Sequence, residues 1–325
     1  MIASSKAVQP CNHVGMRLPV VMLGSLLLLT ACSQDAVDSQ WAEERPMSVP
    51  RSEHPAVLLD DEIVVVGGLV EAGLGRVGVT ETVEAYDPGS GEWRRLPDLP
   101  EPRHHVMASV VGGRLYVIGG FGASGFDPVD SVWELEDGTW VDRARLPAPL
   151  GAGTAVTVDD AIFVVGGTPG GGLMRYDPVD DVWVELSAPE VFREHLAAVV
   201  LDGDIWAIAG REPGRIHSST DIYDVESDEW RSGPGLAEAR SGFGAVVVGG
   251  SIYVAGGEVF QPTETLDSVE VFDPASEEWR LVSSLPLGLH GNPLIEVGGI
   301  LYLPGGSTEA GAVENSGDMW SLDLN

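Results

Sequence analysis

Four arginines stand at equivalent places in a regular internal spacing, and they carry the most conspicuous chemistry of this chain. We call the six equivalent positions slots; they hold Arg51, Arg103, Leu150, Arg193, Arg240 and Leu289. The arginine fork can pair with both oxygens of a carboxylate, so the pattern favours recognition of acidic groups. The two leucines predict that such a site is one-sided and partly apolar.

Residues that follow the slots add groups that could transfer a proton or bind a metal. With two charged residues further along the repeat, the candidates are Glu53, His104, His105, His195, Arg211, Glu258 and His290. Glutamate and neutral histidine can act as general bases. Several of these histidines, together with His54 and Glu53, could also form a metal site. Because each histidine equally fits a hydrogen-bonding role at the start of a strand, we expect no metal and no other cofactor.

The slots belong to a spacing rule that repeats six times. A tryptophan lies ten residues before each slot, and a small-residue pair such as Gly67-Gly68 follows each slot by sixteen residues. An aromatic residue lies seven positions before five of the tryptophans: Tyr86, Trp133, Tyr176, Tyr223 and Phe272. A fixed register with a period near fifty residues is typical of a repeat architecture.

Each unit predicts four short strands. Residues 103–111 and 115–118 are rich in β-branched and aromatic side chains, and Gly112-Gly113 between them is a turn signal. A third strand ends near motifs such as the Ala-Tyr-Asp-Pro at 85–88, and a fourth begins near the tryptophan. Six units of four strands predict an all-β, six-bladed propeller.

The two ends of the repeat do not match. By the repeat rule, the last unit would place its tryptophan at about position 327. At the other end, Trp41 precedes the first unit and has no inner strands before it. We therefore expect the N-terminal strand, around residues 40–44, to supply the outer strand of blade six. Such closure removes two exposed sheet edges.

These features together resemble the kelch-repeat family. The resemblance rests on the double glycines, the Tyr-Asp-Pro and Val-Phe-Asp-Pro segments, the spaced tryptophans and the Leu-Pro-x-x-x-Arg join at 99–103, and it covers residues 41–325. It implies that the slot arginines and their neighbours can hold acidic or anionic ligands. The slot arginine is also part of the family consensus, where it can bridge blades by bonding to backbone carbonyls. We expect that structural role for the arginines alone, whereas His105 and His195 stay open between structure and function.

The binding face is predicted from loop length. From the first glycine of each pair to the next aromatic residue the chain takes between 10 and 19 residues, and the rest of the unit is constant. These segments join the second and third strands, so in a four-stranded meander they share a face with the slots. Insertions confined to one face of a repeat protein often mark its binding face.

Residues 1–31 resemble a bacterial lipoprotein signal peptide. Arg17 precedes an apolar run at 18–29, which is too short to span a membrane, and Leu-Thr-Ala-Cys ending at Cys32 resembles a lipobox. The resemblance implies cleavage before Cys32, lipid on its thiol, and residues 32–40 as a tether. Met16 is an alternative start, and an ordinary secretory signal is the alternative interpretation. We expect an exported cell-envelope protein that is membrane-anchored only through Cys32.

Composition excludes several partners. Removing Lys6 and Arg17 with the signal leaves 16 of the 18 basic residues against 50 acidic ones, a net charge of −34. Such a charge repels nucleic acid and anionic membranes, and we expect a monomer. Cys11 and Cys32 are the two cysteines of the chain, so the propeller has no disulfide. The Tyr–Cys copper centre of galactose oxidase, a kelch propeller, is excluded for the same reason.

Two functions remain open. The first, which we favour, is a non-catalytic module that binds a protein or an acidic-sugar or glycan ligand on its loop-rich face. The alternative is a sugar-active enzyme similar to the periplasmic kelch mutarotase of sialic acid (N-acetylneuraminate), in which an arginine would hold the carboxylate and Glu53 or a histidine would move a proton. The two differ in whether arginine, histidine and glutamate converge within hydrogen-bond reach in one pocket.

Overall fold

The computed structural model describes residues 41–73, 76–123, 125–311 and 314–325, and the secondary structure of these ranges consists of strands and turns. The predicted signal peptide, Cys32 and the tether lie outside the described residues. Among the described residues, no helix has the length and hydrophobicity needed to cross a membrane.

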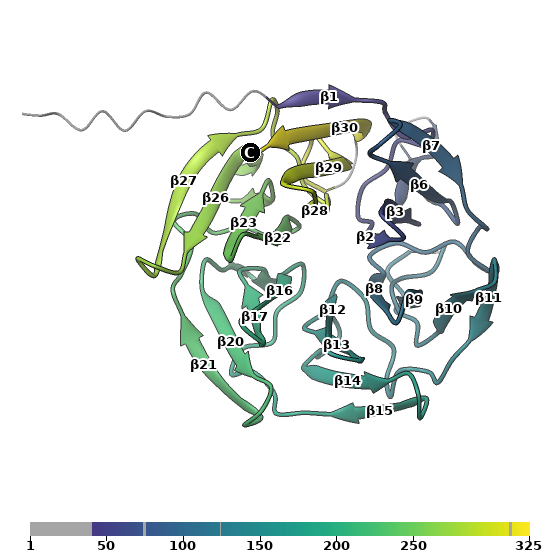
Figure 1. Cartoon of the computed structure of the whole chain (residues 1–325), viewed down its shortest axis with the longest axis horizontal. Helices are drawn as coiled ribbons and strands as arrows, with labels where there is room; N and C mark the ends of the chain where they lie inside the picture. Colours follow the sequence, from purple (N-terminus) through teal and green to yellow (C-terminus); the bar gives the residue numbers. More distant parts are fainter. Residues whose placement is uncertain (1–40, 74–75, 124, 312–313) are drawn as a thin grey trace, which may run out of the picture. The chain divides into compact units, whose positions relative to one another are not determined.

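Six four-stranded antiparallel sheets surround a common axis, as predicted (Figure 1). Blade one consists of β2 (Ala56–Leu59), β3 (Glu62–Val66), β6 (Val83–Asp87) and β7 (Glu92–Arg95). Blade two consists of β8 (Met107–Val111), β9 (Arg114–Ile118), β10 (Val132–Glu136) and β11 (Thr139–Asp142). Blade three consists of β12 (Thr154–Val158), β13 (Ala161–Val165), β14 (Leu173–Asp177) and β15 (Val182–Glu185). Blade four consists of β16 (Ala197–Leu201), β17 (Asp204–Ile208), β20 (Thr220–Asp224) and β21 (Glu229–Gly233). Blade five consists of β22 (Gly244–Val248), β23 (Ser251–Ala255), β26 (Ser268–Asp273) and β27 (Glu278–Ser284).

Blade six joins the two ends of the propeller. Its inner strands are β28 (Ile295–Val297), β29 (Ile300–Ser307) and β30 (Asn315–Asp323), and its outer strand is β1 (Ala42–Glu44). Ala42 pairs with Ser321 and Glu44 with Met319. The predicted closure by the N-terminal strand is therefore confirmed, and the outer edge of β30 is covered.

The hydrophobic core lies between neighbouring blades. Ile205 and Tyr223 of blade four, for example, belong to the same buried cluster as Phe163 and Val165 of blade three. The second strand of each blade is buried on both faces because it packs against both neighbours, which explains its continuous run of apolar residues. Trp41 enters the corresponding cluster between blades five and six and is 8% exposed.

Five of the regularly spaced tryptophans anchor an outer strand to the chain segment that precedes its blade. The indole N–H of Trp93 donates to the carbonyl of Arg45 at 2.7 Å, and that of Trp230 donates to the carbonyl of Ser187 at 2.7 Å. The same contact recurs for Trp140, Trp183 and Trp279. The same side-chain anchor therefore recurs in five blades.

The pairing of the spaced aromatic residues differs in blade two. Tyr86 pairs with Trp93 in blade one, but in blade two Trp140 pairs with Leu135 rather than with Trp133. The reason is the turn between the third and fourth strands, which is shorter in blade two than in the other blades. In blade two the turn is two residues shorter, and the aromatic residue lies two positions earlier on the third strand. The two differences cancel, so Trp133 still lies seven residues before Trp140 although the two do not pair.

The slots and the variable loops share one end of the blades, as predicted. Ser52 forms a β-bridge with Leu69, and each later blade repeats this bridge between the residue after the slot and the residue after the glycine pair. Three of the loops carry additional hairpins, β4 (Leu69–Glu71) with β5 (Val77–Val79), β18 (Arg211–Glu212) with β19 (Arg215–Ile216), and β24 (Glu258–Phe260) with β25 (Thr263–Thr265). We call this end of the propeller the loop face.

Candidate functional site

The slot arginines point into the blades. Arg51 and Arg240 are fully buried, and Arg103 and Arg193 are at most 5% exposed. Arg51 donates to the carbonyl of Thr82 at 2.9 Å and to Glu84 Oε2 at 2.8 Å. Burial lowers the pKa of Arg51 to about 10, against the opposing effect of Glu84. The expected bonding to backbone carbonyls is present, but these side-chain bonds stay within the blade of each slot and do not bridge neighbouring blades.

Each slot faces one equivalent position on the third strand of its blade. Arg51 meets Glu84, Arg193 meets Asp221, and Arg240 meets Glu270. In blade two the equivalent residue is Trp133, and the guanidinium of Arg103 lies over its ring at 5.0 Å from the centroid. The leucine slots face apolar residues in shared clusters, Leu150 with Met174 and Leu289 with Trp320. Slot and third strand thus match in polarity in five blades, and blade two instead stacks Arg103 on Trp133. The slot guanidiniums are held by contacts within the blades and are not exposed to a ligand.

Two residues beyond each slot, the chain closes a ring of backbone hydrogen bonds around the axis. The N–H of each member donates to the carbonyl of its counterpart in the preceding blade at 2.7–3.0 Å. All six members have φ between 51° and 62°, in the left-handed region. In blade order they are Glu53, His105, Ala152, His195, Gly242 and Gly291. We call this set the axial ring.

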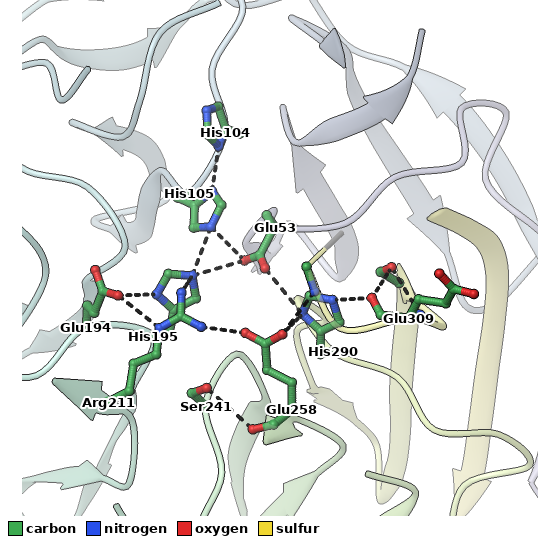
Figure 2. Close-up of polar contacts among 12 residues, drawn as sticks. Glu53, His104, His105, Glu194, His195, Arg211, Ser241, Glu258, His290 and Glu309 are labelled. Atoms are coloured by element: carbon green, nitrogen blue, oxygen red, sulfur yellow. Dashed lines mark hydrogen bonds and ion pairs between the residues drawn. The ribbon is translucent and has the colours of Figure 1, made fainter. Parts of the chain in front are cut away.

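The three large side chains of the axial ring converge (Figure 2). His105 Nε2 lies 3.2 Å from Glu53 Oε2 and 3.0 Å from His195 Nε2, and His195 Nε2 lies 3.9 Å from Glu53 Oε2. Each of the three residues is at most 9% exposed. They border a cavity of about 210 Å³ that the inner strands of all six blades line. The convergence follows from the ring because it aims all three Cβ atoms at the axis.

A second layer of charged side chains surrounds these three. His290 Nδ1 lies 3.4 Å from Glu53 Oε1 and 3.5 Å from Glu258 Oε2. Arg211 donates to Glu258 Oε1 at 2.6 Å and to His195 Nε2 at 3.1 Å. The axial cluster therefore comprises the sequence candidates Glu53, His104, His105, His195, Arg211, Glu258 and His290, together with Glu194.

Burial and neighbouring charges shift the pKa values of these residues in different directions. Burial lowers the pKa of His105 to about 4 and that of His195 well below its usual range, so both rings are neutral near pH 7. Burial would raise the pKa of Glu53, but the surrounding histidines hold it well below its usual range. Burial likewise would lower the pKa of His290, but Glu53 and Glu258 raise it. The cluster thus combines an ionised carboxylate with two neutral imidazoles.

A larger pocket opens on the loop face between blades three, four and five. Its volume is about 940 Å³, and it is lined by loop residues on both sides of the β18–β19 hairpin. Phe192 and Phe260 border it and are 49% and 41% exposed. Arg211 lies on its wall and over the ring of Phe260 at 5.2 Å from the centroid. Arg211 therefore belongs to both the pocket and the axial cluster.

Several of these residues are absent from the sequence candidates. Glu194 follows a slot directly and accepts a hydrogen bond from Arg211 Nε at 2.9 Å, a role that its position in the sequence does not indicate. Phe192 and Phe260 lie in or beside the variable loops, and an isolated aromatic in such a loop is the signal that could have identified them. Cys32 lies outside the described residues.

Comparison with known proteins agrees with this architecture. The KLHDC2/KLHL20/DRC7 Kelch-repeats domain model matches residues 54–257, and the Kelch motif model matches residues 239–286. Kelch-like protein 35 of Mus musculus is 32% identical over 219 residues, which cover 64% of this chain and 36% of that protein. Kelch-like protein terF of Aspergillus terreus is 25% identical over 289 residues, which cover 78% of this chain and 62% of that protein.

The chain therefore spans less than two thirds of the length of these relatives. Among solved structures, the one described as "Structure of YjhT" superposes with a TM-score of 0.73 at 17% identity, covering 85% of this chain and 95% of that one. At this identity the likeness concerns the fold. With the family model matching more than half of its residues, the chain belongs to the kelch-repeat β-propeller family.

Proposed function

We propose that this propeller is a non-catalytic binding module that holds a protein partner on its loop face. The observation that carries the proposal is the pocket between blades three and five, with Phe192 and Phe260 exposed at its border. A volume of about 940 Å³ is at the upper end of the range of ligand pockets, which suits a partner's side chains or a short segment. Kelch domains of related proteins generally bind proteins, which supports the same conclusion.

The chemistry of the pocket indicates what it would recognise. Phe192, Phe260 and Ile216 offer apolar surface, and Arg215 offers positive charge on a strongly acidic protein, whereas Arg211 is already paired with Glu194 and Glu258. Exposed aromatic and arginine side chains are the residues that dominate binding energies at protein interfaces. We therefore expect the partner to insert an apolar or aromatic residue beside an acidic one.

A pair of substitutions tests this proposal. Using the purified propeller as bait for proteins of its source organism, Phe192→Ser with Phe260→Ser should weaken binding of the captured partner by about tenfold or more, as expected for central interface aromatics. Val179, 87% exposed in a turn at the opposite end of blade three, provides the matched control. Val179→Ser should leave the affinity unchanged. Equal affinity of the double variant and the unmodified protein would contradict the placement of the binding surface.

The sugar-active alternative retains one observation in its favour. Arg211, His195 and Glu53 do converge within reach of one another, which was the feature that distinguishes the two hypotheses. The cavity beside them, however, is about 210 Å³, below the range of roughly 300–1,000 Å³ typical of ligand pockets. Mutarotation of N-acetylneuraminate followed by NMR would test it directly: acceleration lost in Glu53→Gln would support an enzyme over a binding module.

We also propose that the propeller is held at the cell envelope by lipid on Cys32. The motivation is the lipobox-like Leu-Thr-Ala-Cys sequence at 29–32. The eight residues 33–40 would give the tether a reach of about 28 Å when extended. Cys32→Ala should move the protein from the membrane fraction to the soluble fraction or block its processing. Identical fractionation of both forms would refute the anchor.

A further inference from the structure

We propose that Glu53, His105 and His195 form a binding site for a first-row divalent metal ion, Zn²⁺ being the best fit, at the axial ring. One carboxylate oxygen and the two Nε2 atoms provide the three ligands. Two histidines with one glutamate form a ligand set typical of zinc sites that keep a fourth position open. The three ligands do not line the protein-binding pocket, although Arg211 and Glu194 border both sites.

The spacing of the three atoms matches metal coordination. From their separations of 3.2, 3.0 and 3.9 Å, the point equidistant from all three lies about 2.0 Å from each. Zinc bonds to histidine nitrogen and carboxylate oxygen are about 2.0–2.2 Å long. An ion at that point would lie in the plane of the three atoms. A tetrahedral site with bonds of about 2.0–2.2 Å needs ligand separations of about 3.3–3.6 Å, so Glu53 and His195 would have to approach each other by about 0.5 Å.

Hydrogen bonding directs lone pairs, and not protons, toward this point. His104 Nε2 lies 3.0 Å from the carbonyl of Gly125, to which it can only donate, so in a neutral His104 the Nδ1 atom accepts. His105 Nδ1, 2.6 Å away, must then be the donor, which leaves His105 Nε2 with a free lone pair facing Glu53. His195 Nε2 likewise accepts, from Arg211. Three acceptors thus face one another, an arrangement that a cation would stabilise.

Two of the three ligands have a supporting group on their far side. His104 hydrogen-bonds to His105, whereas Glu194 Oε1 lies 3.6 Å from His195 Nδ1, beyond hydrogen-bond distance. The second oxygen of Glu53 faces His290 Nδ1 at 3.4 Å. Metal-binding histidines almost always have a partner on the nitrogen that does not bind the ion, and that partner fixes the orientation of the ring.

The backbone adds an independent reason to assign a function to these side chains. Glu53, His105 and His195 have φ of 53°, 51° and 51°, a region in which glycine is favoured and which Gly242 and Gly291 occupy in the same ring. Large residues held there cost of order 1–3 kcal/mol each, and such strain concentrates at functional sites. Glycine would close the ring equally well, so the fold alone does not require an acid and two imidazoles here.

Arg211 is the group that an incoming ion would have to displace. Its Nη2 atom donates a hydrogen bond to the lone pair of His195 Nε2 at 3.1 Å. Its other nitrogens bind Glu194 and Glu258, which can retain the guanidinium when that one hydrogen bond is lost. The cavity of about 210 Å³ bordering the ring has room for water as a fourth ligand.

Titration of the full propeller with Zn²⁺ and with Co²⁺ tests the site. We expect one ion per chain with a Kd in the micromolar range or below, and visible Co²⁺ absorption bands of the intensity given by four-coordinate cobalt. Glu53→Gln and His195→Asn should each weaken binding by at least about a hundredfold, as loss of one of three ligands requires. His217, which contacts Glu212 at 3.1 Å elsewhere on the loop face, is the matched control, and His217→Asn should bind as the unmodified protein does.

Two results would overturn the proposal. The first is an unmodified protein that, after treatment with a chelator, neither binds Zn²⁺ nor gives a Co²⁺ spectrum. The second is binding that survives Glu53→Gln and His195→Asn but is lost in His217→Asn. A circular dichroism spectrum of each variant, recorded without metal, shows whether the variant is folded and so distinguishes loss of the metal site from loss of the fold. The Co²⁺ spectrum of the unmodified protein decides the question even where a variant does not fold.

Discussion

At the scale of single residues, buried charge in this propeller occurs as matched pairs. Arg240 and Glu270 are both fully buried and lie 2.7 Å apart, whereas blade three places Leu150 against Met174 in the same two positions. A buried ion pair gives little net stability over an apolar pair, but removal of one partner leaves an uncompensated charge. A blade can therefore use either pair, and blade two, which places Arg103 against Trp133, pairs that arginine with Glu101 outside the third strand.

This leads to a prediction about Arg240. Arg240→Leu alone should lower the free energy of unfolding by about 3–5 kcal/mol, because Glu270 is left buried without its partner. Adding Glu270→Met should recover most of that loss, since the pair then resembles Leu150 with Met174. Urea unfolding of the three proteins measures both changes. A double variant less stable than the single one would show that the two positions are not coupled.

The buried histidines predict the response to acid. Burial lowers the pKa of His54 to about 3 and that of His105 to about 4. Between pH 6.5 and these values the unfolded chain binds more protons, so stability falls by about 1.4 kcal/mol per pH unit for each such histidine. His290, whose pKa is raised, acts in the opposite direction and loses its contribution as the pH rises. The combined effect of His54, His105 and His195, whose pKa values are lowered, outweighs that of His290.

We therefore expect the metal-free protein to be less stable at pH 5 than at pH 6.5. Urea unfolding across this interval checks the prediction. In His54→Gln the slope of stability against pH should decrease by about 1.4 kcal/mol per unit, since one group no longer contributes. Stability that is constant or rises on acidification would contradict the neutral, buried state of these rings.

At the scale of elements, β1 is short but closes the propeller. Its three residues pair with β30, and Glu44 also accepts hydrogen bonds from Ser321 at 2.7 Å and Tyr86 at 3.0 Å. Trp41 beside it is buried between blades five and six. The strand therefore connects blade six to both of its neighbours, and its contribution exceeds what its length suggests.

Deletion of residues 33–45 tests this role. Loss of the Trp41 packing alone should cost about 3–5 kcal/mol, which corresponds to a fall in Tm of about 10 °C or more for a protein of this size. The unpaired edge of β30 should also promote aggregation. Deletion of residues 33–39, which leaves β1 in place, is the control. Equal melting of the two shortened proteins would refute the stabilising role of β1.

At the scale of the whole molecule, charge opposes the packing between blades. The chain has 50 acidic and 18 basic residues and a net charge of −32, and many of the arginines are engaged in pairs. Self-repulsion of this size destabilises the folded state, and salt screens it over a distance of about 10 Å at 0.1 M. The stability of the propeller should therefore depend strongly on ionic strength.

Thermal unfolding as a function of sodium chloride concentration measures this effect. We expect Tm to rise between about 0.02 M and 0.5 M salt, with most of the rise complete once the Debye length falls below the spacing of surface charges. Potassium chloride should act equally, because screening does not distinguish the two cations. A Tm that falls with salt would mean that surface ion pairs outweigh the repulsion.

The repeat made most of the architecture predictable from sequence. Blade number, strand number, closure near Trp41 and the shared face of slots and variable loops all follow from local spacing, because a blade is built from residues close together in the chain. The different place of Trp133 in blade two could not be predicted, since a spacing does not reveal whether a turn between strands has lost two residues.

The direction of the side chains was decided by tertiary structure. Arg51 and Arg240 look available for a ligand in the sequence, but their partners Glu84 and Glu270 lie about thirty residues away, on the third strand of the blade. Glu53, His105 and His195 come from three blades and meet because the axial ring holds each in a left-handed conformation that aims it inward. Sequence determined which groups are present and in which blade. The closed ring decided which of them are buried in pairs and which converge, because only closure brings residues from different repeats to the same axis.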